Sequence, residues 1–313
     1  MLGYIFRRVL ASIPVILLVA IFSFSLLHLA PGDASSILLG QDATAEDIVA
    51  LRARLGLDRA LPIQFFDWFG GVLRGDLGTS VFSGYSVAEL MADRLQATLS
   101  LAAMGIFIAV VVGVPMGVLA AWKADTWIDR SVMVFAVLGF SIPVFWLGFL
   151  LIWLFAINLD IFPVIGYSPM GDGFLRFLRS MTLPSLALAV AFIALIARMT
   201  RSSMVEVLKE DYIRTAYAKG LRNRVVLIRH ALRAASLPVV TVIGLVFAAA
   251  VAGVVVTETV FSIPGIGRLL VDAVLRRDFP IIQGMMVVIA TAYIAVNLAV
   301  DVLYAFLDPR VRY

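Results

Sequence analysis

Six long apolar stretches constrain the fold of this chain more than any other feature of the sequence. A helix needs about 20 mostly apolar residues to cross the hydrocarbon layer of a membrane, and only helices and closed barrels satisfy their backbone hydrogen bonds there. The stretches are residues 9–30, 98–121, 131–157, 183–197, 237–261 and 281–306. The sequence therefore predicts an all-α integral membrane protein with about six transmembrane helices.

The residue composition agrees with a membrane protein and leaves little room for catalysis on this chain. Hydrophobic residues make up 62% of the 313 residues and charged residues only 15%, a balance far from that of soluble domains. The chain has no cysteine, and its two histidines are too few for a multi-histidine metal cluster. We therefore expect a chain that is not itself an enzyme, with no metal site and no nucleic-acid partner.

The positions of the cationic residues predict how the chain is oriented in the membrane. Short loops rich in Lys and Arg stay in the cytoplasm, and most of the 25 cations fall on the segments that an inside N-terminus would place there. Both termini are thus predicted to be cytoplasmic.

The first apolar stretch follows two cations, Arg7 and Arg8, as the apolar region of a secretory signal peptide does. Its apolar run is longer than that of a signal peptide, however, and Ala30-Pro31 is a poor cleavage site. We expect a retained helix.

The segment between the first two apolar stretches, residues 31–97, carries helix signals of its own. Thr44 and Asp47 resemble a capping box at a helix start, which predicts an ordered lid in this long extracytoplasmic loop. A cluster of four aromatic residues, typical of the membrane interface, follows at Phe65, Phe66, Trp68 and Phe69. We divide the chain into residues 1–97, the first transmembrane helix with its lid, and residues 98–313, the main transmembrane domain.

A basic cytoplasmic segment between the fourth and fifth stretches, residues 198–236, is longer than a simple connector needs. An amphipathic helix is predicted from Glu210 to Arg222, because small and apolar side chains recur there at helical spacing. Its apolar face holds Ile213, Ala216, Tyr217, Gly220 and Leu221. Arg214 follows Glu210 by four residues and is expected to pair with it, and Gly220 allows a turn.

Two interpretations of this amphipathic helix compete. It could lie on the membrane surface with its cations against anionic lipid headgroups, or it could dock into a groove on a cytoplasmic partner. The small residues Ala216, Ala218 and Gly220 favour close docking. A second helix is predicted over residues 225–235, ending before Pro238, which would open the fifth membrane span.

A few residues inside the apolar stretches are candidates for a transport pathway. An ionisable group at mid-bilayer costs about 2.5 to 3.5 kcal/mol on insertion scales, so Asp301 in the sixth stretch is expected to pair with a cation or a helix end. Glu258 precedes a turn at Pro264 that could close the pathway outside. Pro143, beside Ser141, should kink the third span because it lacks an amide donor. All five are named as possible gate or pathway positions.

The most specific motif lies in the basic cytoplasmic segment, at residues 210–216, 218–221, 229–233 and 237–238, and supporting blocks occur at 31–33, 55–58, 75–78, 257–259, 263–268 and 308–310. At these residues the chain resembles the dipeptide, oligopeptide and nickel permease family of bacterial ABC importers, most of all the dipeptide permease B-type subunits. The likeness covers essentially the whole chain.

The resemblance implies that the amphipathic helix is a coupling helix seated in a cleft of an ATPase subunit. The residues carried over to that role are Glu210, Asp211, Tyr212, Ile213, Arg214, Thr215, Ala216, Ala218, Lys219, Gly220 and Leu221. The general importer motif has Glu six residues before the Gly, where this chain has Arg214, so what the Arg214 side chain itself contributes to coupling stays open.

The resemblance also implies the partners. The chain lacks the phosphate-binding pattern G-x-x-x-x-G-K-[ST], so ATP and Mg²⁺ belong to partner subunits and this chain holds no cofactor. The implied assembly contains a second homologous permease subunit, forming a heterodimer, two ATPase subunits and an extracytoplasmic solute-binding protein, in lipid of the bacterial inner membrane.

Other functions remain open from the sequence. An ion-coupled secondary carrier would show repeated halves and titratable intramembrane acids, whereas a membrane-embedded enzyme would need a nucleophile with a base or a metal cluster. The resemblance implies peptides, such as dipeptides or short oligopeptides, as the transported solutes. Related permeases also import glutathione, nickel chelates or oligosaccharides, and nothing in the sequence selects among these.

Overall fold

The structure is a computed structural model that describes residues 2–29, 44, 46 and 58–307, with side chains described over 6–29, 44, 46 and 58–300. Helices make up nearly all regular structure in these ranges, beside one isolated β-bridge between Thr79 and Ser86. Apart from residues 44 and 46, the predicted lid helix that begins at Thr44 and Asp47 lies outside the described residues. The motif blocks at 31–33 and 308–310, and residues 55–57 of the block at 55–58, also lie outside them.

Two compact units make up the chain. The first, the transport unit, comprises Gln96–Arg268 with Val296–Tyr313, and the second, the N-terminal unit, comprises Leu2–Leu95 with Leu269–Ala295. The division into residues 1–97 and 98–313 stays a prediction.

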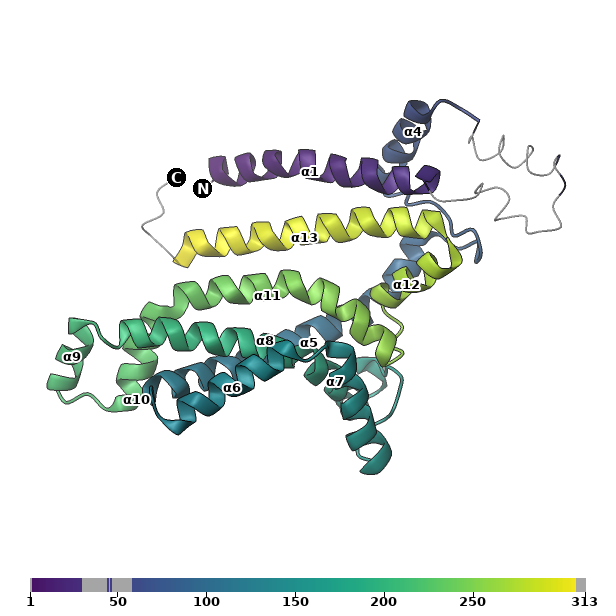
Figure 1. The fold of residues 1–313 in the computed structure, drawn as a ribbon. Helices are drawn as coiled ribbons and strands as arrows, with labels where there is room; N and C mark the ends of the chain where they lie inside the picture. Colours follow the sequence, from purple (N-terminus) through teal and green to yellow (C-terminus); the bar gives the residue numbers. More distant parts are fainter. Residues whose placement is uncertain (1, 30–43, 45, 47–57, 308–313) are drawn as a thin grey trace. The chain divides into compact units, whose positions relative to one another are not determined.

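The transport unit is a bundle of helices that includes most of α5 (Figure 1). Its helices are α5 (Val87–Trp122), α6 (Trp127–Ser141), α7 (Val144–Leu151), α8 (Phe174–Val207), α9 (Asp211–Ala218), α10 (Asn223–Val225) and α11 (Arg233–Val260). Two π-helical segments, Ile152–Asn158 and Val226–Leu232, follow α7 and α10, and a short 3₁₀ helix covers Met170–Asp172.

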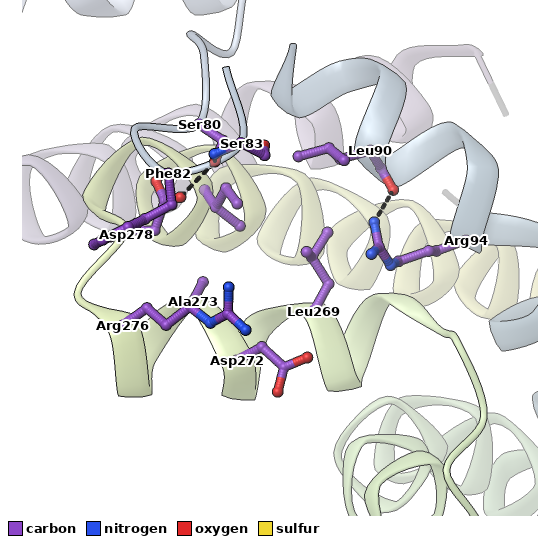
Figure 2. A pocket seen from close by; sticks show the side chains of 11 residues that line it. Ser80, Phe82, Ser83, Leu90, Arg94, Leu269, Asp272, Ala273, Arg276 and Asp278 are labelled. Atoms are coloured by element: carbon purple, nitrogen blue, oxygen red, sulfur yellow. Dashed lines mark hydrogen bonds between the residues drawn. The ribbon is translucent and has the colours of Figure 1, made fainter. Parts of the chain in front are cut away.

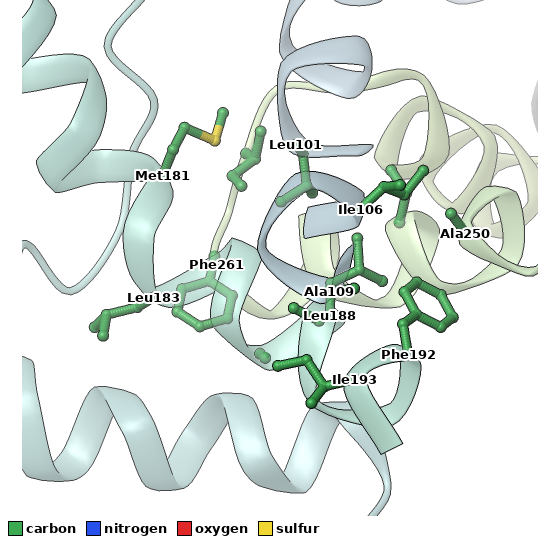
Figure 3. Packing of buried hydrophobic residues seen from close by; sticks show 14 of the residues in the cluster. Leu101, Ile106, Ala109, Met181, Leu183, Leu188, Phe192, Ile193, Ala250 and Phe261 are labelled. Carbon is green, nitrogen blue, oxygen red and sulfur yellow. The ribbon is translucent and has the colours of Figure 1, made fainter. Parts of the chain in front are cut away.

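Helix α8 forms the centre of this bundle. In the most apolar 18-residue stretch of α8, 67% of the residues are buried. This share is twice that found in the corresponding stretch of α5 or of the helix that contains α11. Leu188 and Phe192 of α8 pack in one cluster with Leu101 of α5 and Ala250 of α11 (Figure 3). Because α8 is surrounded by protein, the neighbouring helices rather than lipid determine its position.

Glycines let α5 approach α8 closely, a feature that the sequence interpretation missed. A side chain at Gly113 would lie 3.1 Å from the Ile193 carbonyl oxygen, and one at Gly117 would lie 2.6 Å from the Ala197 carbonyl oxygen. Both glycines face the backbone of α8, as expected where membrane helices pack through small residues. The spacing G-x-x-x-G at 113 and 117 was the available signal.

Within the described ranges, five helices are long and apolar enough to cross a membrane, and a sixth candidate span is broken. The third span, predicted as one kinked helix, consists of Trp127–Ser141 and Val144–Asn158, which meet at 103°. The break has a backbone cause, because a residue before proline avoids the helical region. Ile142 is extended, with φ −78° and ψ 123°, and Pro143 takes the N-cap of α7.

The predicted end of a cytoplasmic helix before Pro238 is wrong. One helix continues from Asn223 to Val260, and Pro238 lies inside α11. Proline is tolerated in membrane helices when nearby hydroxyl groups and local π turns satisfy the freed backbone. A π-helical segment precedes α11, and the Ser236 hydroxyl donates to the carbonyl oxygen of Arg233 at 2.8 Å.

The N-terminal unit contains α1 (Leu2–Leu29), α4 (Leu61–Leu73), the start of α5, most of α12 (Ile266–Arg276) and the first part of α13 (Phe279–Leu307). The Ser23 hydroxyl of α1 donates to the Gln283 carbonyl oxygen of α13 at 3.2 Å. The predicted aromatic cluster lies on α4, where the rings of Phe65 and Trp68 pack against Phe24 of α1 at 5.5 and 5.9 Å. Placement of this cluster at the membrane interface stays a prediction.

Candidate functional site

The amphipathic helix predicted from Glu210 to Arg222 exists as the shorter helix α9 (Asp211–Ala218), between α8 and α10 (Figure 1). It begins at Asp211, directly after Glu210, whose backbone is extended with φ −68° and ψ 145°. Gly220 follows the helix with φ +77°, a left-handed conformation that glycine adopts without strain. The turn expected at Gly220 is therefore present.

One face of α9 is buried within its own chain. Ile213 and Ala216 pack in a cluster with Met204 of α8, Val226 of the π-helical segment and Ala121 of α5. These two α9 side chains cannot reach a partner protein while this packing holds. The predicted apolar face is thus divided between the interior of the chain and its surface.

Two aromatic residues, Tyr212 and Tyr217, flank the buried face of α9, one on each side of it. Tyr212 and Tyr217 retain 46% and 40% of their accessible surface. Partial burial, with a smaller contribution from the Glu210 carboxylate, raises the pKa of Tyr212, so its phenol stays neutral at physiological pH. The other exposed residues of the predicted coupling set are Glu210, Asp211, Arg214, Thr215, Ala218, Lys219, Gly220 and Leu221.

The expected ion pair between Arg214 and Glu210 is replaced by another. Arg214 Nη1 lies 3.3 Å from Asp211 Oδ1. Glu210 precedes the first helical residue, so the spacing of four residues does not place its side chain on the helix surface beside Arg214. Both partners of the observed pair are highly exposed, and such pairs contribute about 0 to 1 kcal/mol.

A buried ion pair joins α6 to α8 in the same unit. Arg201 Nε lies 2.5 Å and Arg201 Nη2 lies 2.6 Å from the two carboxylate oxygens of Asp129, which also accepts the Asp125 amide at 3.0 Å. Two parallel hydrogen bonds of this kind fix the orientation of the two side chains and make the ion pair stronger than a single contact. Sequence reasoning missed it because the residues are 72 positions apart and no local pattern links them.

Glu258 lies in a buried polar cluster where α11 ends and α12 begins. Its carboxylate accepts the Thr98 hydroxyl at 2.6 Å and the Arg268 amide at 3.0 Å, while Thr98 Oγ1 accepts the Ile266 amide at 2.8 Å. A carboxylate beside the first amides of a helix is stabilised by the helix dipole. Glu258 therefore holds the start of α12 against α5 and α11.

The turn before α12 is built around this carboxylate. A Cβ at Gly265 would overlap the Glu258 carboxylate, so glycine is required beside it. Pro264 is exposed next to it, while Ile263 is fully buried and donates its amide to the Glu258 carbonyl oxygen at 2.9 Å. The structure thus brings together two of the candidate pathway residues, Glu258 and Pro264.

The other candidate pathway residues lie elsewhere. Ser141 and Pro143 stand at the break between α6 and α7, where the Ser141 hydroxyl donates to the Val137 carbonyl oxygen at 2.8 Å. Asp301 lies on α13, but its side chain falls outside the described residues, so its expected pairing stays a prediction. Over the described ranges, no three His, Cys, Asp or Glu side chains are grouped in a way that could hold a metal ion.

Sequence comparison matches two family descriptions to the chain. Residues 113–313 match the binding-protein-dependent transport system inner membrane component, and residues 1–102 match its N-terminal counterpart. The probable peptide ABC transporter permease protein y4tP of Sinorhizobium fredii is 47% identical over 99% of both chains. The glutathione transport system permease protein GsiC of Salmonella typhimurium is 43% identical over 100% of both chains.

A solved structure has a similar fold. A chain of the inward-facing MetNI methionine ABC transporter aligns with a TM-score of 0.59 over 70% of this chain and 96% of its own length. The two sequences are 17% identical, so the similarity concerns the fold alone.

Proposed function

Because this chain belongs to the family of binding-protein-dependent transport system inner membrane components, and so is a permease subunit of an ABC importer, we propose that it carries peptides. The observation that supports this solute class is the 47% identity, over nearly the full length of both chains, to a protein named as a peptide ABC transporter permease. Membership of this family rules against the alternative function, an ion-coupled secondary carrier.

Glutathione is a second candidate solute. It is favoured by the 43% identity to glutathione transport system permease proteins, which also extends over the full length of both chains. Because glutathione is itself a short peptide, both candidates share amide groups and terminal charges.

The proposed assembly places ATP chemistry on other subunits. This chain would form a heterodimer with a second related permease, with two ATPase subunits holding ATP and Mg²⁺ on the cytoplasmic side and a solute-binding protein on the other side. Both termini would be cytoplasmic, as the distribution of the cations predicts.

The exposed face of α9 is the proposed contact with an ATPase subunit. Tyr212 and Tyr217 offer two rigid amphipathic side chains, a type common at the centres of protein interfaces. Ala218 and Gly220 are small and exposed, so a partner can approach the backbone closely. Ile213 and Ala216 would support the contact from inside by fixing α9 to its own chain.

The proposed pathway closes at the outer end through the turn held by Glu258. The burial of Glu258 and its bonds to Thr98 and the start of α12 make this turn a defined structural element that can move as one piece. Pro264, exposed on the turn, would contact the passing solute or the partner permease. Ser141, Pro143 and Asp301 stay lower-ranked candidates for the pathway.

The coupling assignment is tested by Gly220→Asp in the purified importer. Asp tolerates the left-handed backbone better than most residues, so the turn should persist while a negative charge enters the proposed ATPase contact. We expect loss of ATP-driven uptake and weaker ATPase association, with membrane insertion unchanged. Gly220→Asn is the matched control, because it shares the backbone tolerance without the charge. Uptake by the Asp variant at the wild-type rate would contradict the assignment.

The solute assignment is tested by identifying the ligand of the cognate solute-binding protein. Proteoliposomes with ATP inside should accumulate labelled dipeptides, short oligopeptides or glutathione supplied with that protein. Accumulation driven by an ion gradient without ATP would contradict the importer mechanism. Accumulation of a non-peptide solute alone would contradict the solute class.

A further inference from the structure

Two pockets of the chain differ in the ligands that they can select. The pocket of about 220 Å³ in the N-terminal unit has two arginines and two aspartates as its charged lining residues, so its charges balance (Figure 2). The other, of about 290 Å³, is a groove between α11 and the C-terminal half of α13, within the transport unit. None of the seven residues that line this groove has a polar side chain. The groove therefore favours hydrocarbon, because a polar group placed there would lose water without gaining a hydrogen bond.

The groove forms where α11 and α13 pack closely. A Cβ at Gly244 would lie 2.6 Å from a methyl carbon of Val300, so glycine allows the two helices to meet. Phe247 of α11 and Ala299 of α13 line the groove and are exposed, which leaves it open at the surface of the unit. An α-helix is about 10 to 12 Å across with its side chains. A groove of about 290 Å³ therefore suits a single acyl chain better than a helix.

The depth of the groove corresponds to one leaflet of the bilayer. The apolar stretch that forms most of α11 begins at Leu237, four residues after Arg233. At a rise of about 1.5 Å per residue, Val240 and Phe247 lie about 5 and 15 Å from the start of this stretch. The hydrocarbon layer is about 30 Å thick, so the groove lies in the half that follows Leu237.

Two arginines lie on the groove side of the same helix, just outside the apolar stretch. Arg233 precedes Val240 by seven residues and Gly244 by eleven, close to two and three helical turns, so the three residues share one face. Arg233 lies about 6 Å before Leu237, at the depth of the lipid headgroups. Arg229 precedes Arg233 by four residues, close to one turn, and lies on the same side.

The positive charge of these arginines is not balanced among the described side chains. Arg229 and Arg233 are exposed, and neither forms an ion pair or hydrogen bond with another described residue. Their helix has no acidic residue from Asn223 to Thr257. The segment 198–236 as a whole has nine cations and three acids, and the acids are Glu206, Glu210 and Asp211. Asp211 pairs with Arg214, so an excess of positive charge remains at this end of the helix.

We propose that an anionic phospholipid binds here, with its phosphate against Arg233 and Arg229 and one acyl chain in the groove between α11 and α13. The arginines and the groove follow one another on one helix face in the order of a lipid headgroup and its chain. A guanidinium can donate two parallel hydrogen bonds to a phosphate, and basic sites between membrane helices on the cytoplasmic side bind anionic headgroups. A helix of the partner permease would cover the groove but leave the arginines without a counter-charge. The lipid belongs to the inner leaflet in the proposed orientation of the chain.

The test uses the complete importer, purified in mild detergent and mixed with phosphatidylglycerol or phosphatidylcholine that carry the same acyl chains. Native mass spectrometry counts the lipids retained by each complex and shows whether both permeases are present. Wild type should retain phosphatidylglycerol in preference to phosphatidylcholine. The double variant Arg229→Gln with Arg233→Gln should bind phosphatidylglycerol about tenfold more weakly, or less, and should bind phosphatidylcholine as wild type does.

Two matched controls separate the site from general effects. Arg222→Gln with Arg224→Gln makes the same charge change at exposed arginines farther from the apolar stretch and should weaken binding less. Ala299→Phe fills the groove and should lower retention of both lipids. Ala249→Phe makes the same change at an exposed alanine on the opposite side of α11 and should retain both lipids as wild type does.

The outcomes that would overturn the inference are distinct from one another. Equal retention of the two lipids by wild type would mean adventitious lipid only. Equal losses in the two arginine double variants would mean a diffuse effect of charge rather than a site. Loss of the second permease from Ala299→Phe would assign the groove to the contact between the permeases. Lipid retention is measured without transport, so a wild-type importer that retains the lipid but shows no ATP-driven uptake would overturn the proposed function and support this inference.

Discussion

Replacing Asp129 with asparagine should lower the stability of the transport unit. The Asp129 side chain is 4% exposed and binds the Arg201 guanidinium through both of its oxygens. The asparagine side chain would keep an acceptor for the Asp125 amide but would lose the charge and one of the two acceptors facing Arg201. The guanidinium would then remain partly buried without its counter-charge.

The size of the effect follows from the burial of the two partners. Removing one member of a buried ion pair costs about 3 to 5 kcal/mol. The Arg201 side chain is 28% exposed and can recover some hydration. We therefore expect the free energy of unfolding to fall by about 2 to 3 kcal/mol, at or just below the lower end of that range. At roughly 2 °C per kcal/mol for a chain of this size, the midpoint of thermal unfolding should fall by about 4 to 6 °C.

The assay is thermal unfolding of the purified protein in detergent, followed by the fluorescence of its five tryptophans. Asp125→Asn is the matched control, because Asp125 is exposed and has φ +64°, a conformation that asparagine also tolerates. That control should stay within about 0.5 kcal/mol of wild type. The double variant Asp129→Asn with Arg201→Gln should be less destabilised than the sum of its single changes, since no uncompensated charge remains.

Unfolding of Asp129→Asn and Asp125→Asn at the same temperature would refute a stabilising role for the buried Asp129 carboxylate. Strict additivity of the Asp129→Asn and Arg201→Gln effects would also contradict it, because additivity would mean that the two side chains do not interact.

Two further predictions concern helix packing and the α9 surface. Gly117→Val should destabilise the bundle by about 1 to 3 kcal/mol or more through overlap with the α8 backbone, whereas Gly171→Ala, with no atom within 4 Å of the added carbon, should leave the unfolding temperature nearly unchanged. Ile213→Ala should cost about 2 to 5 kcal/mol of stability because Ile213 is fully buried. Tyr217→Ala should instead weaken ATPase association, measured by co-purification, with little change in unfolding temperature. If Ile213→Ala and Tyr217→Ala lowered the unfolding temperature equally, the division of the α9 surface into a buried and an exposed part would be contradicted.

The membrane spans could be predicted because the bilayer imposes a length and an apolar composition on each helix. The same rule does not fix where a helix bends. Pro143 was expected to kink the third span, yet it lies at a break of 103°, whereas Pro238 was expected to end a helix and lies inside one. The π-helical segment Val226–Leu232 lies before Pro238, and whether a helix continues through a proline depends on its local surroundings more than on the proline itself.

The candidate site was predictable where the pattern is local. Apolar residues at helical spacing predicted α9, and the glycine at position 220 predicted the turn after it. The pattern did not reveal which apolar residues face the chain itself, because Ile213 and Tyr217 both fit the apolar face by spacing, yet only Ile213 is buried. The pairing of Asp129 with Arg201 joins distant segments, and sequence spacing alone holds no information about it.

The burial of Ile213 and Ala216 has a mechanical consequence. Close-packed interiors are nearly incompressible, so a protein that pushes or pulls on α9 cannot shift it alone. The displacement would also shift Met204 on α8 and Ala121 on α5, which share its hydrophobic cluster. A displacement of the short helix α9 would in this way be transmitted to two candidate membrane-spanning helices at once.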